Sequence, residues 1–247
     1  MNTPARAVTR LREALVGDLC GISFNHGSPH HRFIVALYAS ILELAGDFTI
    51  ALQHSRYSCL PIILRSVVEA HIDFLILIKS EPNHNYILAT FYHDQLRTAK
   101  TALAEKPDGA RSAPSSQQEW EHFRDTAEAE LLRLKNSGYS PLKTRKRFEM
   151  AGKPTWYGSV YSILSSHAHN NLLVLARRHF EKGSVNPQPV FEKEWADADV
   201  LPLVKQMGFV MSEAYAQIRS FFGRPHDQHL DTLAREFLAL CFRRTEG

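Results

Sequence analysis

The chain has 247 residues, of which 44% are hydrophobic and 22% are charged, and its formal net charge is +3. This composition is ordinary for a water-soluble globular protein and too weakly basic for a protein that coats nucleic acid. Cys20, Cys59 and Cys241 lie far apart without a CxxC pair, which argues against a disulfide scaffold and favours a reducing compartment. The N-terminal residues do not resemble a signal peptide, so we expect a cytoplasmic protein.

Apolar residues recur at helical spacing along almost the whole chain, and no segment alternates as a strand would. The pattern predicts helices at residues 4–19, 30–55, 59–80, 84–105, 117–136, 143–151, 156–181, 196–222 and 228–243. Two polar segments rich in turn-forming residues, 106–118 and 182–190, are expected to be exposed loops. We therefore interpret residues 1–247 as a single all-α domain, an antiparallel helical bundle with appended terminal helices.

The third predicted helix contains a polar stripe in an otherwise apolar sequence. In LPIILRSVVEAHIDFLILI, residues 60–78, the charged residues Arg65, Glu69 and Asp73 are spaced four apart and therefore share one face. The stripe is either the solvent-exposed face of the helix, joined by intrahelical ion pairs, or a polar site inside the bundle. These charges argue against a membrane span, since each would cost about 2.5–3.5 kcal/mol near the bilayer centre.

A second polar face lies on the predicted helix 156–181. Tyr161, Ser165 and His169 are spaced four apart, and they offer hydrogen-bond donors, acceptors and a group that titrates near neutral pH. If the two polar faces meet, Arg65 could hold an anion while a carboxylate of the stripe orients His169. Alternatively, these side chains are structural and bond to neighbouring helices or to their own backbone.

The segments that carry these two faces resemble a known family. RSVVEAHIDFLIL, RFEMAG and YSILSSHAHNN are similar to an uncharacterised bacterial helical family, domain-of-unknown-function family 5677. Its Arg-x-x-x-Glu and Tyr-x-x-x-Ser-x-x-x-His patterns match five residues here: Arg65, Glu69, Tyr161, Ser165 and His169. The resemblance covers roughly residues 35 to 180. It implies an α-helical fold but no particular reaction.

A weaker similarity connects the chain to HEPN-type helical domains, many of which are metal-independent ribonucleases. Their arginine is followed five or six residues later by a histidine, as in Arg65 to His71 and Arg224 to His229. The resemblance implies that the histidine handles a 2′-hydroxyl proton while the arginine steadies the phosphate. Arg65 and His71 nevertheless point to different sides of a regular helix.

Metal and nucleic-acid sites have less support in the sequence. The histidine-rich clusters are His26, His30 and His31, and His226, His229 and Asp231. Neither cluster matches the Glu-x-x-His pattern of di-iron bundles or the zinc pattern His-Glu-x-x-His, so we expect no metal and no other cofactor. The basic residues are Lys143, Arg145, Lys146 and Arg147, with Arg177 and Arg178 further along. They form a solvated face, or a phosphate-binding patch if they converge in space.

Two functions remain open at this point. The first is a non-catalytic helical module that binds a small ligand or a protein, with Asp73, Tyr161 and Ser165 as binding or structural residues. The second is a metal-independent HEPN-like ribonuclease, a toxin or defence effector. In that enzyme, His169 would act as acid or base, Arg65 as phosphate clamp and Glu69 as the orienting residue. The partners considered are a second copy of the chain, an RNA or another protein, but no membrane.

Overall fold

A computed structural model describes residues 3–104, 117–169, 171–180, 188–190, 195–225 and 227–242. Within these ranges the chain forms helices, and its one β-type pairing is an isolated bridge between Phe180 and Pro189, so the predicted all-α class is confirmed. Most of both predicted loops, residues 106–116 and 182–187, lies outside the described residues.

The helices follow the chain in this order: α1 (Thr3–Leu19), α2 (Pro29–Gln53), α3 (Leu60–Lys79), α4 (His84–Ala104), α5 (Gln117–Asn136), α6 (Thr144–Ala151), α7 (Pro154–Trp156), a π-helical turn (Tyr157–Tyr161), α8 (Ser162–Ala168), α9 (Leu172–His179), α10 (Asp197–Phe221) and α11 (Gln228–Phe242). Two 3₁₀ turns, Tyr57–Cys59 and Glu81–Asn83, flank α3.

Local signals explain where several of these helices begin and end. The Ser28 hydroxyl accepts a hydrogen bond from the backbone N–H of His31 and so caps α2, whose first residue is Pro29. Helix α6 ends at Gly152, which adopts the left-handed conformation (φ 79°) that glycine tolerates best.

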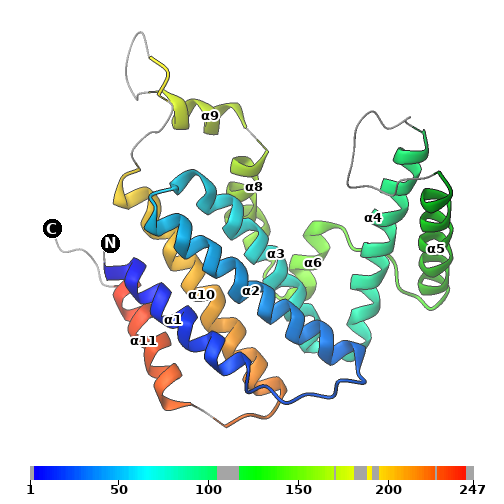
Figure 1. Ribbon diagram of the computed structural model, residues 1–247, viewed down its shortest axis with the longest axis horizontal. Coiled ribbons are helices and arrows are strands. Elements are labelled where there is room, and N and C mark those ends of the chain that lie inside the picture. Colours follow the sequence, from blue (N-terminus) through cyan, green and yellow to red (C-terminus); the bar gives the residue numbers. More distant parts are fainter. Residues whose placement is uncertain are drawn as a thin grey trace.

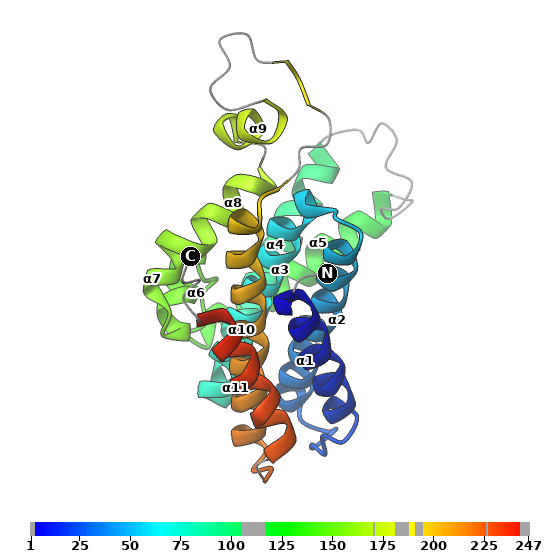
Figure 2. The ribbon, with the colours of Figure 1, turned by 90° about the vertical axis from the view of Figure 1, so that its left-hand side faces the viewer.

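The main body is a bundle in which α2 and α3 run side by side and α10 packs on both of them (Figure 1). Helix α1 packs on both α2 and α10, and α11 packs on α1 and α10, so the first and last helices lie side by side (Figure 2). The terminal helices are part of the core, since Leu11, Leu15 and Phe237 are fully buried. Gly208 allows α10 to approach α11 closely, because a Cβ at this position would lie 1.8 Å from the Phe237 ring.

Helix α2 is the one described helix that is long and apolar enough to cross a membrane by length and composition. It lies in the middle of the bundle, and its buried face includes Ile34, Tyr38, Ile41 and Phe48. A helix that serves as the core of a bundle has the same composition as a membrane span.

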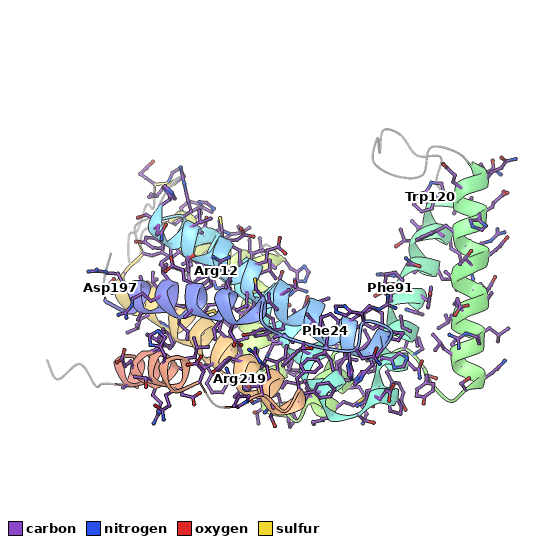
Figure 3. The ribbon with its side chains drawn as sticks, turned by 60° about the horizontal axis from the view of Figure 1, so that its bottom comes forward. Arg12, Phe24, Phe91, Trp120, Asp197 and Arg219 are labelled. Carbon is purple, nitrogen blue, oxygen red and sulfur yellow. The ribbon has the colours of Figure 1, made fainter. Side chains whose placement is uncertain are left out.

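Helices α4 and α5 form a hairpin that projects from the body (Figures 1 and 3). The hairpin has a small core of its own, centred on Ala89, Leu131 and Leu134. Near its base, the Thr90 hydroxyl accepts a hydrogen bond from the backbone N–H of Leu142 in the segment that leads to α6.

The predicted continuous helix at 156–181 is wrong. The chain forms a π-helical turn, then α8, and then a separate helix α9 that begins after Asn171. The Asn171 side chain accepts a hydrogen bond from the backbone N–H of Leu173 and caps the new helix. Asparagine favours such a local bond over a position inside a helix, and this explains the break.

Candidate functional site

The two predicted polar faces meet at their central residues. The Tyr161 hydroxyl accepts a hydrogen bond from Arg65 Nη2 (3.2 Å) and donates one to Glu69 Oε1 (2.9 Å). Arg65 Nη2 also lies 3.2 Å from Glu69 Oε1, and the Arg65 guanidinium lies 5.4 Å from the centre of the Tyr161 ring. The three groups thus form a closed triangle between α3 and the π-helical turn. The side chains of Arg65 and Glu69 are 21% and 34% exposed, so the triangle lies at the edge of the bundle.

The electrostatics of this triangle keep the Arg65 side chain charged. Burial lowers the pKa of Arg65, but the hydrogen bond to Tyr161 and the charge of Glu69 outweigh burial, so the pKa is raised. A π-helical turn such as Tyr157–Tyr161 is rare and occurs often at functional sites. Here it places the Tyr161 ring against Phe148 of α6, with 5.1 Å between ring centres.

Asp73, the third residue of the stripe, is paired with a residue outside the triangle. Arg147 of α6 binds it with two parallel hydrogen bonds, Nε to Oδ1 (2.8 Å) and Nη2 to Oδ2. Both side chains are largely buried. Burial raises the pKa of Asp73, and the attraction of Arg147 offsets part of this effect. The pair joins α6 to α3 through a bidentate arrangement, which fixes their relative position.

Ser165 and His169 lie on α8 beyond the triangle. Ser165 is half-buried, and its carbonyl oxygen accepts a hydrogen bond from the backbone N–H of His169, which caps the C-terminal end of α8. The His169 side chain is exposed. Among the described residues, it forms no hydrogen bond or ion pair with Arg65 or Glu69. It lies eight positions after Tyr161, which corresponds to about 12 Å along a helix axis.

A second polar cluster was not predicted from the sequence. His71 Nε2 donates a hydrogen bond to Glu213 Oε2 (2.9 Å), and Lys153 Nζ donates one to Glu213 Oε1 (2.6 Å). The Lys153 ammonium also lies 5.0 Å from the Trp156 ring centre and 5.5 Å from that of Phe209. The Arg65-to-His71 spacing singled out His71, but no local spacing signal links it to Glu213, 142 positions further along the chain.

The remaining candidates are dispersed. Within the described residues, no group of three or more His, Cys, Asp or Glu side chains could hold a metal ion, and His226 lies outside these residues. Of the basic run, Arg145 and Lys146 pair with Glu149. Arg177 and Arg178 belong to α9, which lies apart from α6 (Figure 1).

A comparison with known protein families gives a match over most of the helices described above. Residues 31–186 match the family of unknown function DUF5677, a range that includes the Arg65–Glu69–Tyr161 triangle and the Asp73–Arg147 pair. The chain belongs to this family. Comparisons with curated proteins and with solved structures gave no significant match. In this DUF5677 chain, Glu213 and the helices α10 and α11 lie beyond the matched range.

We expect the Asp73–Arg147 pair to stabilise the fold. Arg147→Met leaves a largely buried carboxylate unpaired and should lower the free energy of unfolding by about 3 kcal/mol. The double variant Asp73→Leu/Arg147→Met should lose less than the sum of the single changes, with a coupling energy of about 1–3 kcal/mol. Urea unfolding of the four proteins measures both quantities. Arg145→Met, which removes an exposed pair with Glu149, is the matched control and should cost about 0.5 kcal/mol or less. If the stability losses of the two single variants simply added up to that of the double variant, the expectation would be contradicted.

We expect His71 to make stability depend on pH. Burial lowers its pKa, and the hydrogen bond and charge of Glu213 offset part of that effect. Between the lowered folded pKa and the unfolded value of about 6.5, the unfolded chain binds more protons at this site. The contribution of His71 is therefore complete above about pH 6.5 and is lost as the pH falls towards its folded pKa.

The measurement is the free energy of unfolding as a function of pH for the wild type and His71→Gln. The variant should be less stable at neutral pH by about 1–3 kcal/mol, because Glu213 loses a buried partner. It should also lose less stability than the wild type when the pH falls below 6.5. His169→Gln controls for the removal of an exposed imidazole. If the free energy of unfolding fell equally steeply with pH below 6.5 in the wild type and in His71→Gln, this role would be contradicted.

Proposed function

We propose that this DUF5677 chain is a non-catalytic helical module that binds protein, and that its polar stripe stabilises the bundle. The observation that carries the proposal is the closed triangle of Arg65, Glu69 and Tyr161, in which each side chain binds the other two. Asp73 is likewise bound by Arg147. These side chains bind one another, as structural polar residues inside a bundle do, although the buried Arg65 Nε has no hydrogen-bond partner among the described residues.

The arrangement offers less support for the ribonuclease alternative. That activity needs a proton-transfer group and a phosphate-binding cation around one reacting position. The exposed His169 lies at the far end of α8, away from Arg65, while the buried His71 is bonded to Glu213 on another side of α3.

The hairpin of α4 and α5 is the element we assign to partner binding. Phe91 and Leu132 are 51% and 58% exposed, although both belong to its amphipathic helices. Phe91 follows Ile87, which packs on the main core, by one helical turn, and it lies on the side of α4 that faces away from α5 (Figure 3). A two-helix hairpin with so small a core gains stability when a further helical surface covers it.

The partner that fits this hairpin best is a second copy of the chain. Two hairpins packed together give a four-helix bundle, the arrangement in which amphipathic helices bury their apolar sides most completely. Such a contact is isologous, so the same exposed residues of both copies contribute to it. We further propose a cytoplasmic location, supported by the exposed free thiols of Cys20 and Cys59, which suit a reducing compartment.

The oligomeric state tests this assignment. We expect the wild type to be a dimer by sedimentation or light scattering, and Phe91→Glu and Leu132→Glu to shift it to monomer, because a charge in the apolar contact is costly. Circular dichroism should show unchanged helix content. Ile163→Glu, at a 62% exposed position on α8, is the matched control and should remain dimeric. A wild type that stays monomeric at every concentration would contradict the hairpin as a self-association surface.

Incubation with total RNA in EDTA tests whether the chain is a metal-independent ribonuclease. We expect the wild type, Arg65→Ala and His169→Ala to leave the RNA equally intact, because the three residues of the triangle are engaged with one another. RNA cleavage by the wild type that both folded variants lose would overturn the proposal and establish a metal-independent ribonuclease.

A further inference from the structure

A separate group of buried polar side chains lies where α1, α2 and α10 meet. Asp18 stands at the end of α1, Tyr38 in the middle of α2, and Tyr215 and Arg219 in the last turns of α10. All four side chains are more than nine-tenths buried. Helices α1 and α10 run side by side here (Figure 2), and Arg219 lies where α10 approaches its end (Figure 3).

Several contacts bring these side chains together. Arg219 Nη1 lies 3.3 Å from Asp18 Oδ1, and Arg224 Nη1 lies 3.0 Å from the same oxygen. The Arg219 guanidinium lies 5.2 Å from the centre of the Tyr215 ring. Burial raises the pKa of Tyr38, and the neighbouring Asp18 and Tyr215 raise it further, so the Tyr38 hydroxyl is within their electrostatic reach.

Each of the four main side chains contributes one polar atom that has no hydrogen-bond partner in the part of the chain that the structure describes. Among the described residues, buried atoms without a hydrogen bond include Asp18 Oδ2, Tyr38 Oη, Tyr215 Oη and Arg219 Nε. Buried polar atoms are rarely left without a partner, since the loss of solvation is not compensated. Four such atoms on three helices that pack on one another call for a further small partner.

The four atoms define what this partner must be. The Asp18 oxygen can only accept a hydrogen bond, the Arg219 Nε–H can only donate one, and a tyrosine hydroxyl can do both. Burial raises the pKa of Tyr215 to about 12, so its hydroxyl keeps its proton at neutral pH. The partner must therefore both donate and accept hydrogen bonds.

Charge favours a neutral partner at this junction, because Asp18 lies against the guanidinium groups of Arg219 and Arg224. An anion would lie against the Asp18 carboxylate and near the C-terminal ends of α1 and α10, where the helix dipoles are negative. A cation would face the guanidinium groups of Arg219 and Arg224. The smallest neutral molecule with both donors and acceptors is water, and a buried water typically makes about three hydrogen bonds to such groups.

We propose that the junction of α1, α2 and α10 is a built site for ordered water, which bridges the Asp18 carboxylate, the hydroxyls of Tyr38 and Tyr215, and the Arg219 guanidinium. The bound water joins three helices that have no direct hydrogen bond between these atoms. It thereby adds to the direct hydrogen bond that Arg219 Nη1 donates to Asp18 Oδ1, which joins α10 to α1 across 201 positions of the chain.

Magnetic relaxation dispersion of the water signal tests the proposal, since it counts water molecules held for long times inside a protein. We compare the wild type with the double variant Tyr38→Phe/Tyr215→Phe, which removes two of the four groups. The expected result is the loss of at least one long-lived water. Tyr92→Phe, which changes a half-buried tyrosine of the hairpin, is the matched control. Its relaxation dispersion should have the same amplitude as that of the wild type. An unchanged amplitude in the folded double variant would overturn the proposal.

A second measurement decides the question if the double variant does not fold. A high-resolution crystal structure of the wild type should show ordered density within hydrogen-bond distance of Asp18 Oδ2 and of at least one tyrosine hydroxyl. Direct hydrogen bonds from the Tyr38 or Tyr215 hydroxyl to Asp18, with no density between them, would overturn the proposal. A bound ion or other solute in this position would do the same.

Discussion

The structure depends on the enclosure of α3, an apolar helix that also carries ionisable side chains. Helices α2 and α10 cover it on one side, and α6 and α8 on another. An ionisable group taken out of water without a partner is costly, so each such side chain of α3 needs a partner from the helix that covers it. Tyr161 binds both Arg65 and Glu69, Arg147 binds Asp73, and Glu213 binds His71. These pairs fix which segment lies over each part of α3, a selectivity that apolar packing alone supplies poorly.

Much of the fold follows from the sequence, because amphipathic spacing and local caps act within a few residues. The long helices begin and end within two residues of the predicted positions. The helix predicted at 156–181 shows where apolar spacing fails as a guide to helix boundaries. Its apolar spacing continues through the region, but the Asn171 cap and the π-helical turn at Tyr157–Tyr161 interrupt it, and neither changes the apolar pattern enough to be detected.

The candidate site could be predicted in part. Steps of four placed Arg65 and Glu69 on one face and Tyr161 on another, and the structure joins these faces. The pairing of Asp73 could not be predicted, because Arg147 belongs to a basic run whose other members are exposed. Sequence spacing describes one helix at a time, whereas the choice of Arg147 over its neighbours depends on how α6 packs against α3.

The separation of Arg65 from His71 has a direct bearing on catalysis. Six residues apart on one helix, they are about 120° apart around its axis. Arg65 is bonded to Tyr161, and His71 to Glu213 on α10. To act on one phosphate together, both side chains would have to leave their partners and expose a fully buried imidazole. Such a change would leave Tyr161 and Glu213 without these hydrogen bonds and would disrupt the packing of α3 against α10. The polar groups that make α3 resemble a catalytic helix are therefore the groups that bind it to the segments packed around it.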